Sequence, residues 1–267
     1  MKKCIIGVIG CGNMAGAIVR GMVSKNHVKP ESILLCDKVI EKADCLSNET
    51  LCLRKDLAGV LSEADILLIA VKPQDLSCLL EEIAPDVKEH TIISIAAGIG
   101  IGTILEKIGK RVPVVRAMPN IAAFVNESIT CIAHNDMARG IIEEVKIIFS
   151  GIGDVAEIEE GLFDSVTALS GSGPAYLFYL AGAMIDAGVN LGLSKDVSKK
   201  LVFQTLFGSS RLLKEDNISP KELIEKVASK GGTTEAALAV FDSEKFDDII
   251  KKAITKAKAR SEEISGR

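Results

Sequence analysis

The feature that most limits the fold of this chain is an apolar run followed at once by closely spaced glycines. Residues 5–9 are mostly apolar, Gly10 and Gly12 follow, and a stretch with helical periodicity covers 13–25. A buried strand, a glycine turn and a helix in this order form the context of a dinucleotide-binding fingerprint. Gly10 permits the tight turn, and Gly12 lets a pyrophosphate approach the first amides of the helix. We therefore predict a nicotinamide cofactor site here.

An acidic residue at the end of the next predicted strand bears on the choice of cofactor. Asp37 stands where a carboxylate accepts hydrogen bonds from the adenosine ribose hydroxyls, and it repels the extra phosphate of NADP. The neighbouring Lys38 offsets part of that repulsion. We expect NADP and NAD both to be usable, with a lean toward NAD that rests on Asp37.

Apolar runs and helical stretches alternate through the first half of the chain. Runs such as 65–71 and 91–97 are apolar almost throughout, which is typical of strands covered on both faces. The alternation predicts an α/β Rossmann-type domain with a doubly wound, mainly parallel sheet. We expect strands at 4–9, 32–37, 65–71, 91–97, 112–117, 127–133 and 153–158, and helices at 13–25, 74–84, 101–109 and 137–149.

Helical periodicity dominates from Glu160 onwards. We predict a dinucleotide-binding domain at 1–159 and an all-helical substrate-binding and dimerisation domain at 160–267. The stretch 174–193 carries one charge, Asp186, and is apolar almost all round, so its helix must be buried on every side. In so small a helical domain, that cover must come from a second subunit. The charged tail from residue 251 onwards indicates a solvated helix face.

Composition excludes several other classes of protein. The net charge is −4 and no basic patch stands out, which argues against a nucleic-acid partner. Asp186 and several glycines make 174–193 a poor membrane span, so no membrane partner is expected. The seven cysteines form no Cys-x-x-Cys pair. Their odd number argues against a disulfide framework and a zinc site, so we expect no metal and a cytoplasmic location.

Further glycine- or proline-marked loops follow predicted strands. In open parallel sheets ligands bind beyond the carboxyl ends of the strands, so these loops should face one crevice. They are Val71-Lys72-Pro73, Ala96-Ala97-Gly98 and Met118-Pro119-Asn120. In the helical half, the glycine pair Gly231-Gly232 precedes Thr233-Thr234 at the start of a predicted helix. Such a loop presents free backbone amides and hydroxyls to a carboxylate or another small anion.

These motifs together resemble the pyrroline-5-carboxylate reductase family. The resemblance runs collinearly over essentially the whole chain, and its last two motifs are the most specific. It is carried by Gly-Cys-Gly-Asn-Met-Ala (10–15), Ala-Val-Lys-Pro (70–73), Ser-Ile-Ala-Ala-Gly (94–98), Arg-Ala-Met-Pro-Asn (116–120), Leu-Ser-Gly-Ser-Gly-Pro-Ala-Tyr (169–176) and Gly-Gly-Thr-Thr (231–234). It implies reduction of 1-pyrroline-5-carboxylate to L-proline with NAD(P)H, and a C-terminal helical domain that interlocks with a partner subunit.

The resemblance also implies a role for each motif residue. Thr234 would place its hydroxyl near the imine nitrogen, and the loop Gly231, Gly232 and Thr233 would bind the substrate carboxylate. Glu160 matches a substrate-side acid. The residues implied in cofactor binding are Gly10, Gly12, Asn13, Met14, Asp37, Val71, Lys72, Pro73, Ala96, Ala97, Gly98 and Asn120.

The chemistry of an imine agrees with the residues available. Hydride delivery is easiest when the imine nitrogen is protonated, so the enzyme needs at most a weak proton donor. The three histidines, His27, His90 and His134, all lie outside the helical half.

Two alternatives remain open. A β-hydroxyacid dehydrogenase of the 6-phosphogluconate type would need a lysine on the long helix, where none occurs between Lys146 and Lys195. A non-catalytic redox sensor would bind a dinucleotide and a protein partner, but it would not need the Gly-Gly-Thr-Thr loop.

Overall fold

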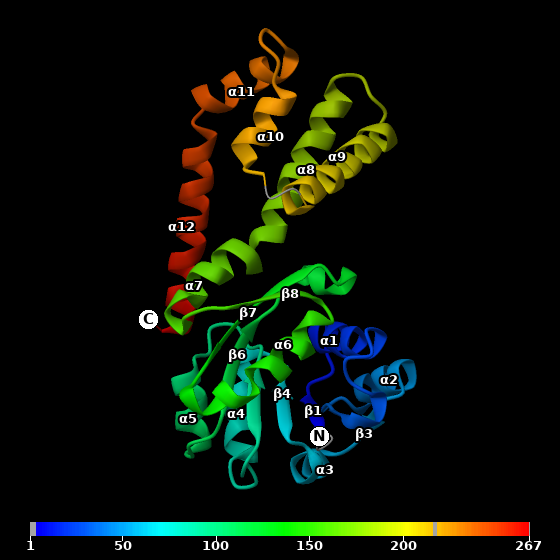
Figure 1. The fold of residues 1–267 in the computed structure, drawn as a ribbon, viewed down its shortest axis with the longest axis vertical. Coiled ribbons are helices and arrows are strands. Elements are labelled where there is room, and N and C mark those ends of the chain that lie inside the picture. Colours follow the sequence, from blue (N-terminus) through cyan, green and yellow to red (C-terminus); the bar gives the residue numbers. More distant parts are fainter. Residues whose placement is uncertain (1–3, 216–217, 267) are drawn as a thin grey trace. The chain divides into compact units, whose positions relative to one another are not determined.

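A computed structural model describes residues 4–215 and 218–266 of the chain, and its N-terminal part is built on one eight-stranded sheet (Figure 1). The strand order is β3-β2-β1-β4-β5-β6-β7-β8, and all neighbouring pairs are parallel except β6 with β7. This confirms the predicted mainly parallel sheet. The strands are β1 (Ile6–Ile9), β2 (Ile33–Cys36), β3 (Leu53–Arg54), β4 (Ile66–Ile69), β5 (Thr91–Ser94), β6 (Val114–Met118), β7 (Ser128–His134) and β8 (Gly153–Glu157).

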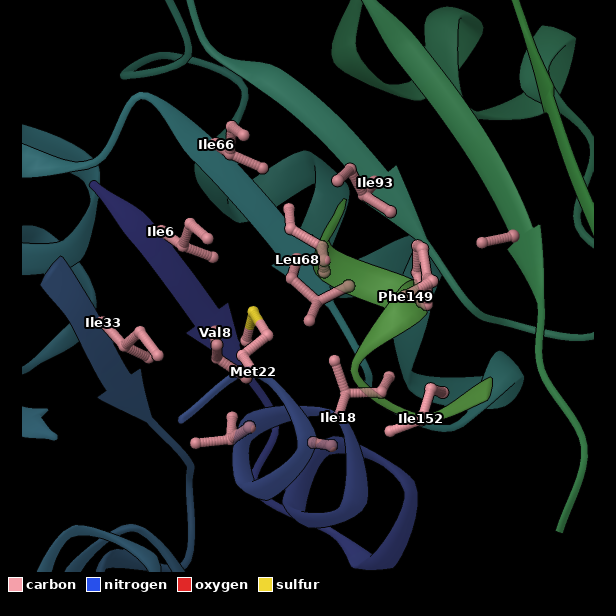
Figure 2. Close-up of a cluster of buried hydrophobic side chains, with 14 of the residues drawn as sticks. Ile6, Val8, Ile18, Met22, Ile33, Ile66, Leu68, Ile93, Phe149 and Ile152 are labelled. Atoms are coloured by element: carbon pink, nitrogen blue, oxygen red, sulfur yellow. The ribbon is translucent and has the colours of Figure 1, made fainter. Parts of the chain in front are cut away.

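Helices cover both faces of this sheet because the central strands are apolar on both sides. One buried cluster joins the sheet to α1 (Asn13–Ser24), α2 (Ile40–Thr50) and α6 (Ile142–Ser150). Figure 2 shows part of this cluster, with Ile18 and Met22 of α1 and Phe149 of α6 facing Val8 and Leu68 of the sheet. A second cluster joins the other face to α3 (Leu57–Glu63), α4 (Pro73–Ile83) and α5 (Ile101–Ile108).

The structure corrects the sequence-based assignment at three places. Strand β3 was not predicted, because its two residues are both exposed and form no apolar run. Helices α2 and α3 were also missed; they follow β2 and β3 as the connections of a doubly wound sheet. The helix predicted at 137–149 begins as a 3₁₀ turn, η3 (Asp136–Ile141), and becomes α-helical only at Ile142. Gly140 lies within that turn, where an α-helix would be weak.

The remaining part of the chain is helical, as predicted. Within the sheet-containing part, short 3₁₀ turns occur at η1 (Pro30–Ser32) and η2 (Ile121–Val125). After the last strand come another 3₁₀ turn, η4 (Glu160–Leu162), and a π-helical turn, η5 (Thr167–Gly171). The helices after the sheet are α7 (Phe163–Val166), α8 (Gly173–Asn190), α9 (Lys195–Glu215), α10 (Pro220–Val227), α11 (Thr233–Ser243) and α12 (Phe246–Ser265). None of the helices within residues 4–215 and 218–266 is long and apolar enough to cross a membrane.

Packing divides the chain into two compact units. The first comprises the residues up to Ser172 together with those from Ala257 onwards, and the second comprises Gly173–Lys256. The boundary proposed between residues 159 and 160 follows the change from strands to helices, and it stays a prediction. The last turns of α12 were expected to be solvated, but they are partly buried. They belong to the first unit, and Ser261 is buried there.

Helix α8 leaves large apolar side chains in solvent when the chain is considered alone. Leu177, Phe178 and Tyr179 are 57%, 65% and 84% exposed, and Ala181 is the only buried residue of this helix. The sequence pattern requires cover on every side of this helix. A single chain therefore supplies only part of that cover.

Helix α1 approaches the loop before β8 so closely that only glycine fits. A Cβ added at Gly21 would lie 2.7 Å from the carbonyl oxygen of Gly151 and 2.7 Å from Cγ2 of Ile152. Since the first of these atoms belongs to the backbone, it cannot turn away as a side chain would. This contact fixes the position of the helix that follows the glycine turn.

We therefore expect Gly21→Ala to lower the free energy of unfolding by about 1–3 kcal/mol through overpacking. The matched control is Gly102→Ala in α5, where an added Cβ meets nothing within 4 Å. That change should raise the stability by a few tenths to about 1 kcal/mol, because alanine favours a helix. Urea unfolding of both variants measures the difference. An equal effect of the two substitutions would contradict the close-packing argument.

Candidate cofactor and substrate sites

The glycine turn between β1 and α1 forms an open anion-binding cradle. Gly10 has a φ of +96°, and a Cβ there would lie 2.9 Å from the carbonyl group of Ala70, so a side chain is excluded. Above Gly12 an added Cβ would meet nothing within 4 Å, which leaves room for a ligand. Gly12 is the N-cap of α1, and neither a side-chain cap nor an acidic residue occupies this described helix end. The first amides of α1 are therefore available to a phosphate.

A cavity of about 620 Å³ lies beside this cradle, at the carboxyl ends of β1, β2 and β4. Five of the predicted cofactor residues line it: Gly10, Gly12, Asp37, Val71 and Lys72. Apolar side chains that include Leu57 and Leu79 form other parts of its wall. This combination of apolar walls with a few polar groups suits the adenosine half of a dinucleotide.

Asp37 has a structural task that the sequence did not reveal. Its Oδ2 accepts a hydrogen bond from the Cys11 amide at 2.6 Å, and its Oδ1 accepts one from the Val39 amide at 2.8 Å. The carboxylate thus ties the glycine turn to the end of β2. Each carboxylate oxygen has a second lone pair, so Asp37 is still able to accept from a ribose hydroxyl.

Basic side chains surround Asp37 in the cavity wall. Arg54 is paired with Asp44 at 2.9 Å, and Lys55 with Glu63 at 2.7 Å. Lys38 and Lys42 also line the cavity, and no acidic partner is found for either in the described part of the chain. Lys38 was expected here from the sequence, whereas Lys42, which comes one helical turn later at the start of α2, was not. These two cations can offset the charge of Asp37 toward a phosphate.

Cys11 lies inside the glycine turn but is not a reactive thiolate. Its thiol donates to the carbonyl oxygen of Cys36 at 3.6 Å. Burial, together with the nearby Asp37 carboxylate, raises the pKa of Cys11 to about 12. Burial also raises the pKa of Cys36 and Cys52 above the ordinary value. These thiols stay protonated at neutral pH and act as small apolar groups.

The other predicted cofactor residues lie outside the lining of this cavity. They follow the carboxyl ends of β1, β4, β5 and β6, which the parallel pairing brings to one edge of the sheet. These residues are Asn13, Met14, Pro73, Ala96, Ala97, Gly98 and Asn120. The edge therefore continues from the cavity toward the place where the second half of a dinucleotide would extend.

The side chain of Asn120 is occupied by bonds within the protein. Its Oδ1 accepts from the Ala122 amide at 3.1 Å, and its Nδ2 donates to the Ser170 carbonyl oxygen at 3.2 Å. Asn120 thus connects the loop after β6 to the Ser-Gly-Ser-Gly motif. Its predicted contact with the cofactor stays a prediction.

Glu160 is likewise held by internal contacts. Its Oε1 accepts from the Ile101 amide at 2.7 Å and lies 3.5 Å from Nη1 of Arg116. Arg116 is 2% exposed and lies over the ring of Phe163 at 4.3 Å. Glu160 therefore caps α5 and neutralises a buried cation. Arg116 was part of a recognised motif, but its ion pair with Glu160 was not predicted.

The Gly231–Thr234 loop differs in one respect from its predicted form. The Gly231 amide donates to Oε2 of Glu235 at 2.6 Å, and the Gly232 amide donates to the Ser229 carbonyl oxygen at 2.9 Å. Neither glycine amide is therefore free, because the loop folds back on itself. The amides of Thr233 and Thr234 begin α11, and among the described residues no acceptor is found for them. These two amides are the ones left for an anion.

No group of three or more histidine, cysteine, aspartate or glutamate side chains within the described residues is arranged to hold a metal ion. The chemistry of these sites therefore has to be judged from amides, hydroxyls and charged side chains.

Several known proteins match this chain over nearly its whole length. Residues 160–264 match the family described as pyrroline-5-carboxylate reductase dimerisation, and residues 5–98 match one described as NADP oxidoreductase, coenzyme F420-dependent. Pyrroline-5-carboxylate reductase 2 of Bacillus subtilis is 34% identical, over 99% of this chain and 95% of that protein.

Two solved structures extend this similarity to the fold. A pyrroline-5-carboxylate reductase from Coxiella burnetii is 32% identical with a TM-score of 0.93, covering 98% of this chain and 99% of that one. The pyrroline carboxylate reductase of Plasmodium falciparum, solved with NADP bound, is 29% identical with a TM-score of 0.86. That match covers 99% of each chain.

The position of Asp37 in the cavity predicts its effect on cofactor preference. Replacing Asp37 with Ser or Asn removes a negative charge that opposes the 2′-phosphate of NADPH. The ratio of the NADPH and NADH affinities should shift toward NADPH by about tenfold, as expected for a charge-assisted contact of roughly 1.5–3 kcal/mol. Nicotinamide fluorescence titration of each variant measures both affinities without substrate.

The matched control is Asp75→Asn, which removes a carboxylate from the same cavity wall and leaves the Cys11 and Val39 amides bonded to Asp37. Its affinity ratio should stay within about twofold of that of the unaltered protein, well below the tenfold expected for a direct contact. An unchanged ratio in both Asp37 variants would mean that Asp37 does not face the ribose.

Proposed function

The chain belongs to the pyrroline-5-carboxylate reductase family, and we propose how its residues carry out the reaction of that family. 1-Pyrroline-5-carboxylate is reduced at its imine bond to L-proline, the last step of proline biosynthesis. NADH or NADPH, when bound, supplies the hydride. The observation that carries this proposal is the Gly-Gly-Thr-Thr loop with two available amides, found in a chain that aligns with these reductases from end to end.

The residues of the first unit fit a dinucleotide. Gly12 has open space above it, no side chain caps the first amides of α1, and the adjoining cavity is lined by Asp37 and Lys72. We assign the pyrophosphate to the α1 amides and the adenosine ribose to Asp37. Lys38 and Lys42 then bind the 2′-phosphate of NADPH electrostatically, so the site accommodates both NADH and NADPH.

The start of α11 provides the groups that the substrate needs. The Thr233 and Thr234 amides bind the substrate carboxylate, where the helix dipole also favours negative charge. The half-buried Thr234 places its hydroxyl at the imine nitrogen. Gly231 and Gly232 act by shaping the loop, since their own amides are bonded within it. Glu160 stays a predicted substrate-side acid through its second carboxylate oxygen.

The imine reaction removes the need for a strong acid or base. The nitrogen is already protonated when hydride reaches the neighbouring carbon, and the product amine is basic. A hydroxyl that orients the ring is therefore sufficient. The histidines are used elsewhere: His90 bonds the carbonyl oxygen of Leu61, and His134 bonds Glu157.

The two alternative functions are less well supported. A β-hydroxyacid dehydrogenase of the 6-phosphogluconate type needs a lysine on its long helix, and α8 has none. A redox sensor without catalysis gives no reason for the threonine hydroxyl at the start of α11. The family's reaction needs no lysine on α8 and gives a use for the threonine hydroxyl of α11.

We also propose how the protein assembles and where it is located. The exposed apolar side chains of α8, with those of α9 such as Phe203 and Phe207, are the surface that a second copy covers. We therefore propose a homodimer or higher oligomer through the C-terminal helices. The seven free thiols fit the reducing cytoplasm.

Turnover of 1-pyrroline-5-carboxylate tests the reaction. The purified protein should oxidise NADH or NADPH in the presence of this imine and release L-proline. Thr234→Val keeps the side-chain shape and removes the hydroxyl, so kcat/KM should fall by roughly tenfold or more, the value of a hydrogen bond to a charged group. Thr233→Val is the matched control and should lose less, because its proposed contribution is a backbone amide.

A protein that reduces other cyclic imines or oxidises 3-hydroxy acids, but leaves 1-pyrroline-5-carboxylate untouched, would refute the assignment. Equal losses in Thr233→Val and Thr234→Val would refute the specific role of the Thr234 hydroxyl.

Assembly is tested at the middle of α8. Ala183→Asp places a carboxylate on the exposed apolar helix, and burying that charge unpaired in an interface is strongly unfavourable. We expect this variant to sediment as a monomer and to lose activity, whereas Ala183→Ser, nearly the same size and uncharged, should do neither. A native protein that sediments as a fully active monomer would contradict the proposal.

A further inference from the structure

The last turn of α12 lies against the loop that follows β5. A Cβ added at Gly98 would be only 3.1 Å from Cγ2 of Ile264, and 3.8 Å from the Ile264 carbonyl oxygen. Gly98 has a φ of +77° and lies in the middle of the β5–α5 connection, residues 95–100, which contains the Ala96–Gly98 loop. These two residues are 166 positions apart in the sequence, so the contact depends entirely on the fold.

A buried hydrogen bond holds this turn of α12 in place. The Ser261 hydroxyl donates to Oδ1 of Asp164 at 2.7 Å, and the Ser265 hydroxyl reaches the same oxygen at 3.5 Å. Ser261 is 8% exposed and Asp164 is 3% exposed. Figure 1 shows the red end of α12 beside α7, which carries Asp164. The bond is therefore shielded from water and fixes the end of the helix.

The two ends of the β5–α5 connection are held independently of α12. At its start the Ala96 amide donates to the Ser94 hydroxyl at 3.3 Å. At its far end the Ile101 amide donates to Glu160 at 2.7 Å. The middle of this connection needs support from elsewhere, because the Ala97 side chain is exposed and Gly98 has no side chain. Ile264 is the side chain that reaches it.

Ile264 is 62% exposed in the single chain, so it is not part of a buried core. Its removal would uncover little apolar surface to water, since most of that surface is already uncovered. The contact with Gly98 therefore contributes little to folding. The Ile264 side chain instead limits the space available to the Ala96–Gly98 loop.

From these contacts we propose that the last turn of α12 positions the Ala96–Gly98 loop for the cofactor, with Ile264 as the positioning residue. The inference rests on the proposed function only in that it takes this loop as part of the cofactor site. Ser261 and Asp164 hold the turn, Ile264 limits the loop, and the loop then presents its backbone in one conformation. Cofactor affinity thus depends on residues near the end of the chain.

The test is Ile264→Ala, read by nicotinamide fluorescence titration of NADPH and NADH without substrate. We expect both dissociation constants to rise by about fivefold, within the range by which residues outside a site alter affinity. The thermal unfolding midpoint should stay unchanged, and kcat at saturating cofactor should stay close to that of the unaltered protein. A positioning residue changes KM in this way, whereas a merely structural residue changes stability.

Two variants make the result specific. Ile264→Val retains the Cγ2 atom that faces Gly98, so it should bind the cofactor as the unaltered protein does. Ile250→Ala is a control in the same helix. Ile250 is 40% exposed, and its removal should leave cofactor affinity unchanged. Normal cofactor affinity in Ile264→Ala, or equal loss in Ile264→Val and Ile264→Ala, would overturn the inference. Because binding is measured without substrate, these outcomes are distinct from a failure of the proposed reaction.

Discussion

The parallel pairing of β1 with both β2 and β4 is the constraint on which the rest of this structure depends. It places Ile9, Cys36 and Ile69 side by side, so the chain leaves three neighbouring strands at one edge of the sheet. The glycine turn, Asp37 and the loop with Lys72 meet there for that reason alone. Continuation of the parallel order through β5 and β6 brings the Ala96–Gly98 and Asn120 loops to the same edge. The proposed cofactor site is thus a consequence of strand order.

Carboxylates that accept from backbone amides and hydroxyls give this edge its detailed shape. Asp37 ties the glycine turn to β2, and Glu160 ties the start of α5 to Arg116. Asp164 accepts from Ser261, near the end of α12. In the first two cases an acidic side chain fixes a loop or helix start at this edge of the sheet, and in the third it fixes the helix turn that meets such a loop. A loop that is held in one conformation before its ligand arrives loses less entropy on binding.

The sequence predicted the sheet well because its strands are apolar on both faces, as the run around Leu67 illustrates. It missed β3, which pairs with β2 alone and exposes both of its residues. The position of Asp37 was predictable, but its bonds to two amides depend on how separate loops approach each other. The same holds for Gly232, whose amide turns back to Ser229, and for Ile264, which meets Gly98 from the far end of the chain. Residue type and spacing carry no information on such tertiary contacts.

The most direct test of the account is to follow hydride from the cofactor to the product. The protein is incubated with 1-pyrroline-5-carboxylate and NADH or NADPH that carries deuterium at the transferred position of the nicotinamide ring, and the proline is analysed by mass spectrometry and NMR. We expect one deuterium in proline, on the former imine carbon, which is Cδ. Proline without deuterium, or no proline while the reduced cofactor stays bound, would contradict it.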